Sequence, residues 1–192
     1  MDEQLVSKFY QIWNLAKENS PLNQESAVCI STVNGSGYPE SRFVDLKEVS
    51  IQGFTFCTSY DSAKAKNLAS NPKISLAVWW DHIGYQIRVV GNASRISDEL
   101  ADNYWDDRSL EAQIASTCFD QSEAWSSKST MEDHFASALK AIDRRVSRPN
   151  YWGGFTVNPY SVEFLKFEVN RVHRREQFIK EGAAWRLRML QP

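Results

Sequence analysis

Short β-forming runs separated by turn signals are the feature that most limits the folds open to this chain. Residues 27–33 are rich in β-branched side chains, and the Asn-Gly-Ser-Gly stretch at 34–37 has the composition of a hairpin turn. Similar runs follow at 41–49, 53–59, 74–80 and 86–96 and, after a helical stretch, at 155–157, 161–169, 176–180 and 184–190. Consecutive antiparallel hairpins of this kind predict a closed or nearly closed β-barrel with helices added to it.

Helices are expected at the start of the chain and in its middle. The spacing of apolar residues between Leu5 and Ala16 predicts an amphipathic helix over residues 3–18. Asp61 or Ser62 is expected to cap a short helix that ends before an Asn-Pro pair. Three more helices are predicted from 97 to about 107, from 110 to 118, and from a capping box at 129–132 with Phe135, Leu139 and Ile142 on the inner face.

Composition and charge exclude several classes of protein. A length of 192 residues fits one domain, and 42% hydrophobic with 24% charged residues are ordinary values for a globular fold. A net charge of −2 argues against a general nucleic-acid binder. The longest apolar run, at 74–80, is far shorter than a membrane helix, and the acidic N-terminus lacks the features of a signal peptide. We therefore expect a cytoplasmic protein without a membrane segment.

The cysteines and histidines form no recognisable metal motif. They are widely spaced, with no CxxC pair and no HExxH or similar spacing, at Cys29, Cys57, Cys118, His82, His134 and His173. No metal or disulfide site is therefore predicted. Three reduced thiols fit a cytosolic protein better.

Two segments in the first half of the chain could bind anions. Arg42 and Lys47 lie on one expected strand, and because they are five residues apart a regular strand directs them to opposite faces. They are either ordinary surface cations or ligands of two different anionic groups, unless a local bulge intervenes. The segment 58–64 runs from a strand into a helix start and ends in Lys64, a pattern that suits phosphate binding but also plain helix capping.

Further polar side chains could contact a ring or a second phosphate. Gln86 opens an expected strand and Gln121-Ser122 follows the middle helices, and an amide can both donate to and accept from the edge of a heteroaromatic ring. Tyr104 and Arg108 are four residues apart and share a helix face. They could clamp a phosphate, although a structural ion pair of Arg108 is an equally common arrangement.

The last third of the chain combines glycines, aromatic residues and cations. The Tyr-Trp-Gly-Gly-Phe stretch at 151–155 has two glycines after Trp152, which allow the backbone to approach something flat or bulky. About twenty residues later, an Arg-x-His-x-Arg tract places Arg171, His173 and Arg175 within a few residues of one another. The combination suits a planar anionic ligand.

Taken together, these segments resemble the pyridoxamine 5′-phosphate oxidase family of flavoenzymes, in family order from about residue 27 to residue 192. The resemblance implies a mainly β fold with α additions, the FMN-binding split β-barrel, and a homodimer whose flavin sites are built from both subunits. It also implies that 1–192 form a single FMN-binding domain. Within it, 1–20 would be an N-terminal helix and 150–192 a C-terminal segment for substrate binding and dimerisation.

The resemblance also implies roles for individual residues. The FMN phosphate would be held by Arg42 and Lys64, and the rest of the flavin would be contacted by Thr58, Gln86, Gln121, Ser122, Trp152 and Arg175. The substrate phosphate would be bound by Lys47, Tyr104 and Arg108. The catalytic residues Arg171 and His173 would lie against the substrate ring.

The implied reaction is oxidation of pyridoxamine or pyridoxine 5′-phosphate to pyridoxal 5′-phosphate by FMN and dioxygen, with hydrogen peroxide as a product. Two alternatives remain open. One is a related FMN-dependent oxidase that acts on another ring compound, as the phenazine-biosynthesis members of the family do. The other is a non-catalytic protein that binds FMN or pyridoxal 5′-phosphate. A haem-handling split barrel ranks below both, because the sequence offers no convincing axial ligand beyond the three scattered histidines.

Four departures from the family pattern bear on this expectation. Ala63 stands where the family has an arginine at the FMN phosphate, and Ala112 replaces a serine at the substrate phosphate. Residues 165–168 replace a Trp-Gln-Gly-Gly-like stretch beside the substrate pocket, and Met189 stands at an arginine position. The flavin site is thus mostly kept, whereas the surroundings of the substrate site are altered.

Overall fold

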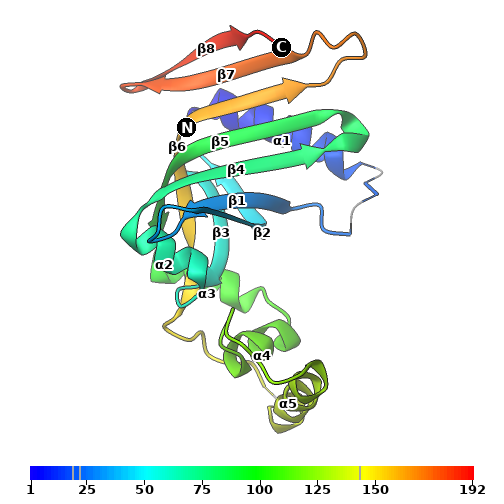
Figure 1. The fold of residues 1–192 in the computed structure, drawn as a ribbon, viewed down its shortest axis with the longest axis vertical. Helices are drawn as coiled ribbons and strands as arrows, with labels where there is room; N and C mark the ends of the chain where they lie inside the picture. The colour runs from blue at the N-terminus through cyan, green and yellow to red at the C-terminus, as the bar shows by residue number, and fades with distance from the viewer. Residues whose placement is uncertain (19, 22, 143) are drawn as a thin grey trace.

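One antiparallel sheet forms the centre of the molecule, and the computed structural model describes residues 1–18, 20–21, 23–142 and 144–192. The strand order is β3-β2-β1-β4-β5-β6-β7-β8 (Figure 1). The strands are β1 (Ala27–Val33), β2 (Pro39–Ser50), β3 (Gly53–Ser59), β4 (Lys73–Trp80), β5 (Tyr85–Arg95), β6 (Trp152–Lys166), β7 (Arg174–Glu181) and β8 (Ala184–Leu190). The helices are α1 (Glu3–Lys17), α2 (Ala63–Ser70), the 3-10 turn η1 (Asp81–Ile83), α3 (Asp98–Asp106), α4 (Leu110–Cys118) and α5 (Lys128–Ala141).

A pairing between β3 and β6 closes six of the strands into a barrel. In this pairing Trp152 lies opposite Ser59 and Val157 lies opposite Phe54. The β7–β8 hairpin continues the sheet beyond β6, outside the closed ring (Figure 1). Closure removes the unpaired edges of an open sheet, and it confirms the barrel with added helices that the hairpin pattern predicts.

The N-terminal helix α1 packs its apolar face onto the barrel core. The Asp2 carboxylate accepts a hydrogen bond from the Leu5 N–H and so caps the helix. Phe9 is buried and its ring meets those of Phe54 and Trp80. Burying a large apolar side chain of this kind contributes about 1.5–3 kcal/mol. The expected N-terminal helix is therefore confirmed, together with its buried face.

Two strands that the sequence predicts in the tail are in fact one. Separate strands at 155–157 and 161–169 are wrong, because β6 is continuous over 15 residues. Pro159 suggests an interruption because proline has no N–H for a ladder hydrogen bond. Here it lies opposite Gly91, where the register with β5 shifts, so the proline is accommodated at a bulge. The continuous strand connects the two ends of the molecule.

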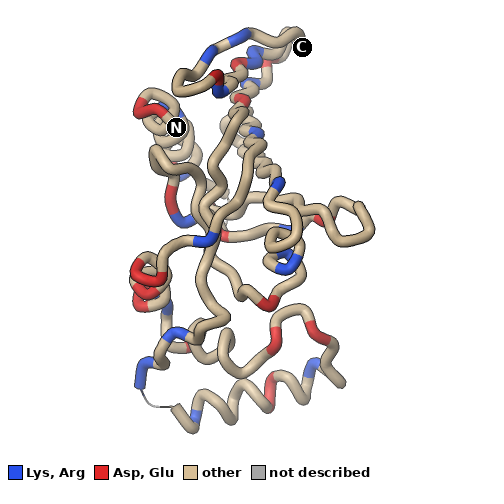
Figure 2. The backbone as a smooth tube through the Cα atoms, turned by 90° about the vertical axis from the view of Figure 1, so that its left-hand side faces the viewer, with Lys and Arg blue, Asp and Glu red and all other residues tan. Residues whose placement is uncertain are grey.

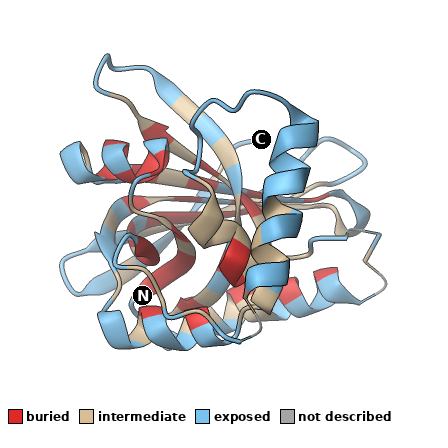
Figure 3. Cartoon of the chain, turned by 90° about the horizontal axis from the view of Figure 1, so that it is seen from below, coloured by how far each residue is buried: buried red, intermediate tan, exposed pale blue. Residues whose placement is uncertain are grey.

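The last helix begins earlier than its sequence signal predicts. The N-cap of α5 is Ser127, whose hydroxyl accepts a hydrogen bond from the Thr130 N–H, so the predicted capping box at 129–132 is wrong. Two residues of the predicted inner face, Phe135 and Leu139, are only partly buried. Figure 3, which views the molecule from this end, shows the buried residues concentrated in the barrel.

Helices α3 to α5 and the β7–β8 hairpin occupy opposite ends of the fold. Helices α3, α4 and α5 gather at one end, and the hairpin lies at the other (Figure 1). Acidic and basic residues are intermixed along the chain (Figure 2). Within the described residues, no helix is both long and apolar enough to span a bilayer. Because β6 runs between the two ends, it separates the cavity described below from the C-terminal segment.

Candidate functional site

A cavity of roughly 610 Å³ lies where the barrel meets α2 and α4. Its walls come from β2, β3, the start of α2, the end of α4 with the segment after it, and the first residue of β6. Seven of the residues predicted to form a site line it: Arg42, Thr58, Lys64, Arg108, Gln121, Ser122 and Trp152. The fold therefore brings together groups that are far apart in the sequence.

Lys64 is a buried cation with no ion-pair partner among the described residues. It is only 7% exposed, and its Nζ donates a hydrogen bond to Thr58 Oγ1 at 3.1 Å. Burial, with a smaller contribution from Arg42, lowers the pKa of the Lys64 ammonium to about 8. A buried charge is costly without a partner, so this part of the cavity favours an anion.

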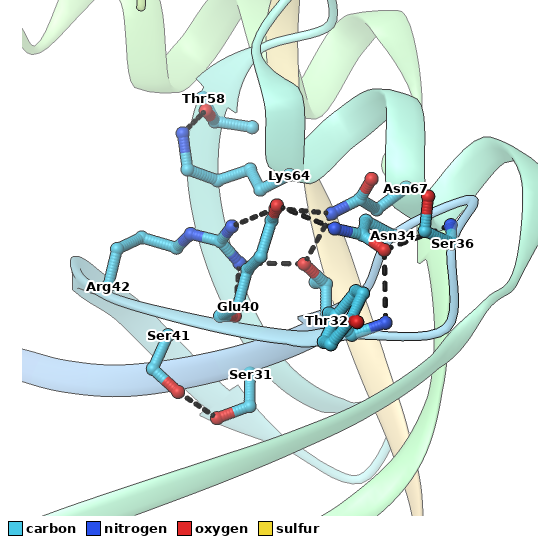
Figure 4. A network of polar contacts seen from close by, with 11 residues as sticks. Ser31, Thr32, Asn34, Ser36, Glu40, Ser41, Arg42, Thr58, Lys64 and Asn67 are labelled. Carbon is cyan, nitrogen blue, oxygen red and sulfur yellow. Dashed lines mark hydrogen bonds and ion pairs between the residues drawn. The ribbon is translucent and has the colours of Figure 1, made fainter.

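Arg42 lines the same cavity and is held by β1 and β2. Its Nη1 donates to Thr32 Oγ1 at 2.7 Å and to the Glu40 carbonyl at 2.8 Å, and its Nη2 donates to the Glu40 carboxylate at 3.2 Å (Figure 4). Its charge is close enough to lower the pKa of Lys64. Neighbouring cations repel each other, and an anion bound beside both relieves that repulsion.

The start of α2 differs in detail from the sequence prediction. Ser62 occupies the cap position, but its hydroxyl donates to the Ser59 carbonyl at 2.7 Å and makes no capping bond to the helix. The expected side-chain cap is therefore wrong. Helix N–H groups that lack a side-chain cap remain available to another acceptor, and a phosphate is a suitable one.

A second group of predicted residues lies near the Cys57 thiol, which lines the first cavity together with Arg108. Burial raises the pKa of this thiol to about 12, although Lys47 and Arg108 are near enough to act in the opposite direction. Cys57 also influences Tyr104, whose pKa is raised mainly by burial and by the hydrogen bond to Glu48. The three expected ligands of the substrate phosphate therefore gather in one region.

Two of these three ligands are already bound to carboxylates. Lys47 Nζ forms an ion pair with Asp45 Oδ2 at 2.5 Å, and Tyr104 Oη donates to Glu48 Oε2 at 2.9 Å. Burial opposes ionisation of Asp45, but hydrogen bonds from Lys47 and Ser26 outweigh it and hold the Asp45 pKa below its usual value. Lys47 lines a different hollow from the first cavity, and the wall of that hollow also includes Trp13, Lys17 and Asp45.

Arg108 is held by α4 and stacked near the start of β6. Its Nη2 donates to the Ala112 carbonyl and to Ser116 Oγ, each at 2.8 Å. Its guanidinium carbon lies 5.0 Å from the ring centre of Trp152, and its Nε is buried without a hydrogen-bond partner. Within the described residues Arg108 forms no ion pair, so the structural ion pair considered from the sequence is not seen. The unpaired Nε is available to a ligand.

The opposite orientation of Arg42 and Lys47 is confirmed. Arg42 bonds to the buried Thr32 side chain, whereas Lys47 pairs with Asp45 on the other face of β2. The β2–β3 register shifts between Leu46 and Glu48, so the local bulge also exists, with Lys47 as the extra residue.

The two glycines after Trp152 have a structural purpose. A Cβ on Gly153 would lie 2.2 Å from the Tyr60 hydroxyl, and one on Gly154 would lie 2.4 Å from the Phe56 carbonyl. The flat group that packs against Gly153 is therefore the Tyr60 ring, and the backbone that lies close to Gly154 is that of β3. They allow β6 to close the barrel, and the expectation that they approach a ligand is not supported.

Four predicted site residues lie away from the cavity. Gln86 pairs with Leu165 near the far end of β6, and Arg171, His173 and Arg175 follow that end. At about 3.3 Å per residue, the 14 steps of β6 span up to roughly 45 Å. The described chain therefore does not bring these four residues to the cavity lined by Arg42 and Lys64 (Figure 1).

The C-terminal residues have partners of their own. Arg171 adopts a left-handed backbone conformation with φ of 66°, which is uncommon for a residue with a side chain. His173 Nδ1 accepts a hydrogen bond from the Glu168 N–H at 3.1 Å. Arg175 Nε donates at 2.8 Å to the buried carboxylate of Glu163, which also pairs with an arginine of β5.

The sequence prediction did not include the side chains that hold these groups. Glu40 binds Arg42, Ser116 binds Arg108, and Glu163 binds Arg175. Ser116 lies one turn after Ala112, so a hydroxyl is present near Arg108 even though position 112 lacks one. The sequence did contain a signal for Glu163: a charged residue within an apolar strand is rarely buried unless it is paired, so its position indicates a cationic partner.

Comparison with known proteins decides the family. The model of the family described as pyridoxamine 5′-phosphate oxidase matches residues 16–140, and that of the pyridoxine 5′-phosphate oxidase C-terminal dimerisation region matches 152–192. This chain belongs to the pyridoxamine 5′-phosphate oxidase family. It is therefore an FMN-dependent oxidoreductase, as the resemblance implied, and FMN is its cofactor.

Relatives of this oxidase family cover most of the chain. A pyridoxine/pyridoxamine 5′-phosphate oxidase of Thermosynechococcus vestitus is 34% identical over 95% of this chain and 87% of its own length. The Haemophilus influenzae protein of the same name is 34% identical over 99% of this chain and 90% of its own. The matched dimerisation region supports the expected homodimer.

Solved structures confirm the split-barrel fold of the family. PhzG from Burkholderia lata, in complex with tetrahydrophenazine-1-carboxylic acid, has a TM-score of 0.89 and 25% identity over 98% of this chain and 91% of its own. A pyridoxamine 5′-phosphate oxidase-related, FMN-binding protein of Nostoc punctiforme has a TM-score of 0.79 and 16% identity, over 95% and 96%.

FMN fits the cavity of this oxidase family member. A flavin with a phosphate tail needs a buried cationic end, and Lys64 with Arg42 supplies one. It also needs an aromatic and polar wall, and Trp152 and Gln121 supply side chains of those kinds. The residues present are therefore compatible with the cofactor.

Proposed function

We propose that this chain oxidises pyridoxamine or pyridoxine 5′-phosphate to pyridoxal 5′-phosphate, with consumption of dioxygen and formation of hydrogen peroxide. The observation that carries the proposal is the presence of two groups of anion-binding side chains around strands β2 and β3. One group contains Arg42 and Lys64, and the other contains Lys47, Tyr104 and Arg108. Two groups are what a phosphorylated cofactor and a phosphorylated substrate require.

Arg42 and Lys64 would hold the FMN phosphate. The ammonium of Lys64 is buried and lacks an ion-pair partner among the described residues, so a phosphate would supply the missing negative charge. Thr58, Gln121, Ser122 and Trp152 line the same cavity and would contact the rest of the flavin. The chemistry that FMN supplies when bound is hydride acceptance followed by reoxidation with dioxygen.

Lys47, Tyr104 and Arg108 would bind the substrate phosphate. Arg108 offers its buried, unpaired Nε, and its stacking near Trp152 keeps the guanidinium plane in place. Lys47 and Tyr104 would have to exchange their bonds with Asp45 and Glu48 for bonds to the phosphate. Substrate binding on this side therefore involves competition with internal carboxylates.

A second copy of the chain would supply the rest of the site. Gln86 lies beside the far end of β6 and Arg171, His173 and Arg175 follow that end, so these residues are too distant to reach the cavity of their own copy. We propose that 150–192 act as the substrate-binding and dimerisation segment, and that these four residues face the cavity of the partner. The match of 152–192 to a dimerisation region supports this arrangement.

Arg171 and His173 would orient the substrate ring. A planar guanidinium fixed over the ring holds the reacting carbon in place, and such positioning can contribute several kcal/mol to a barrier. His173 already has its Nδ1 fixed by the Glu168 N–H, which leaves Nε2 to face a ligand. We assign these residues to orientation and hydrogen bonding.

The test is anaerobic mixing of FMN-loaded protein with pyridoxamine 5′-phosphate, followed by flavin absorbance near roughly 450 nm, the band of oxidised flavin. We expect rapid bleaching, then recovery of colour with hydrogen peroxide when air is admitted. Bound flavin that stays oxidised with this substrate and with pyridoxine 5′-phosphate would contradict the proposed reaction.

A second candidate is oxidation of a ring compound without a phosphate. The observation in its favour is that Lys47 and Tyr104 are bonded to Asp45 and Glu48, which leaves less positive charge for a phosphate. The PhzG structure, whose bound tetrahydrophenazine carries a carboxylic acid, gives an example of another ring ligand on this fold. Bleaching with such a ring acid but not with pyridoxamine 5′-phosphate would favour this candidate. Flavin that neither compound reduces would favour a non-catalytic binder.

A further inference from the structure

Glu40 is a carboxylate placed beside a site that must bind an anion. It lies on β2 two residues before Arg42, and its side chain reaches the guanidinium of that residue (Figure 4). By charge alone, a carboxylate in this position weakens phosphate binding. Its presence therefore needs an explanation other than electrostatic attraction.

The hydrogen bonds of Glu40 explain how Arg42 keeps its orientation. The Glu40 carbonyl and carboxylate accept from different nitrogens of Arg42, at 2.8 and 3.2 Å. Thr32, which is fully buried, accepts a further bond from the same guanidinium at 2.7 Å. These contacts engage Nη1 and Nη2, and the Arg42 side chain still lines the cavity.

Glu40 is in turn held by two asparagines. Asn34 donates to its Oε1 at 3.0 Å and Asn67 donates to its Oε2 at 2.9 Å (Figure 4). These bonds are the main reason that the Glu40 pKa lies below its usual value, so the group remains an acceptor. Asn34 belongs to the β1–β2 turn and Asn67 to α2, so Glu40 ties Arg42 to two separate elements.

We propose that Glu40 is a positioning residue of the FMN phosphate site, which fixes Arg42 beside Lys64. This inference rests on the proposed assignment of Arg42 and Lys64 to that phosphate. Arginine has considerable side-chain freedom, and a guanidinium held in place before binding loses less of it when the phosphate arrives. The gain in orientation exceeds the repulsion between the Glu40 carboxylate and the phosphate.

The test uses the fact that the two effects of Glu40 on FMN affinity are opposite: its orientation of Arg42 strengthens binding, whereas its negative charge weakens it. Apo-protein is titrated with FMN and, separately, with riboflavin, which lacks the phosphate, and binding is followed by quenching of flavin fluorescence. Glu40→Ala should weaken FMN binding roughly tenfold and leave riboflavin binding unchanged. Glu40→Gln keeps one carbonyl acceptor and should lose less than Glu40→Ala. If Glu40→Ala binds FMN as tightly as the parent or more tightly, charge dominates and the proposal is overturned.

A control variant and a double mutant separate positioning from other causes. Glu99→Ala removes an exposed carboxylate of α3 that forms no ion pair within the described residues, and it should leave FMN binding unchanged. In an Arg42→Ala background, Glu40→Ala should have no further effect on FMN affinity. An equal loss in both backgrounds would overturn the proposal, because Glu40 would then not act through Arg42. Circular dichroism of each variant checks that the fold is kept.

The same titrations distinguish this inference from the assignment on which it rests. A parent protein that binds FMN and riboflavin equally would show that no phosphate site exists, which overturns both. A parent that prefers FMN, with an unaffected Glu40→Ala variant, would overturn the role of Glu40 alone. Neither result depends on turnover of a substrate.

Discussion

The two groups of anion-binding side chains differ in how their charges are balanced. In the group proposed to hold the cofactor phosphate, Lys64 is buried with no ion pair in the described chain, and Glu40 neutralises only Arg42. In the group proposed to bind the substrate phosphate, Lys47 is paired with Asp45 and Tyr104 donates to Glu48. The first group therefore has a net positive charge before any ligand arrives, whereas the second is largely balanced by the protein itself.

This difference indicates different demands on the two ligands. A cofactor that stays bound benefits from a preformed cationic site, because the cost of orienting the side chains is met during folding. A substrate must also leave after each turnover, and a site whose cations return to internal carboxylates favours release. With the proposed roles, the substrate group would also be incomplete within one copy, because Arg171 and His173 follow the far end of β6.

The largest expected effect tests whether the distant segment completes the substrate side. Arg171→Ala should slow anaerobic flavin reduction on the order of 100-fold or more, because the substrate ring loses its orienting group, and FMN should stay bound. Stopped-flow absorbance measures the rate. Arg174→Ala, which removes a neighbouring cation paired with Glu176, is the matched control and should change the rate little. Loss of flavin from Arg171→Ala would instead place this residue on the cofactor side.

The next effect tests the preformed cationic site. Arg42→Ala should weaken FMN binding by about tenfold to 100-fold, because a hydrogen bond to a charged group contributes about 1.5–3 kcal/mol. Riboflavin binding should not change. Lys66→Ala removes an exposed cation of α2 and is the control. A variant of Arg42 that stays fully yellow at low flavin concentration would show that Arg42 is a surface cation.

A gain of affinity is expected on the substrate side. Asp45→Asn frees Lys47 from its ion pair and should tighten binding of pyridoxal 5′-phosphate by about tenfold, with binding of pyridoxal unchanged. Equilibrium titration of FMN-loaded protein measures both. Asp81→Asn, at an exposed carboxylate in the β4–β5 connection, is the control. Unchanged or weaker binding to Asp45→Asn would mean that the internal ion pair does not compete with the phosphate.

The smallest expected effect is a loss of FMN affinity as the pH rises. The pKa of Lys64 is lowered to about 8, so the ammonium loses its proton as the pH rises through that value, and FMN binding should weaken. Between about pH 7 and about pH 8.5 we expect a loss of about fourfold, from the fraction of protonated lysine. Lys64→Arg keeps its charge over this range and should flatten the profile. An equally steep profile for riboflavin would rule out Lys64 as the group responsible.

Local elements were largely predictable from the sequence because their signals are local. The β1 and β3 strands, α4 and the cap of α3 at Ser97 are found where hydrophobic pattern and turn chemistry predict them. The failures arose where a distant partner overrides a local signal. Pro159 lies within a continuous strand because a bulge beside Gly91 on β5 accommodates it.

The sequence predicted which cations belong to the site, but it did not predict which carboxylates balance their charge. Arg42, Lys64 and Arg108 could be named from residue type and spacing, and all three line the cavity. The positions of the carboxylates depend on packing between elements. Glu40 is held by asparagines of a turn and of α2, and Glu48 accepts a hydrogen bond from a tyrosine of α3. Such contacts join segments with no spacing rule between them.

The sequence by itself therefore determined the β-barrel class and the identity of the charged groups, because periodicity, turn chemistry and residue type are carried by neighbouring positions in the chain. The family was indicated by the resemblance of whole segments in their order along the chain. Only the tertiary structure decided that the Gly153-Gly154 pair admits Tyr60, that Lys64 is buried without a described ion-pair partner, and that β6 separates Arg171 from the cavity. The physical reason is that burial and charge pairing depend on which distant segments meet when the barrel closes.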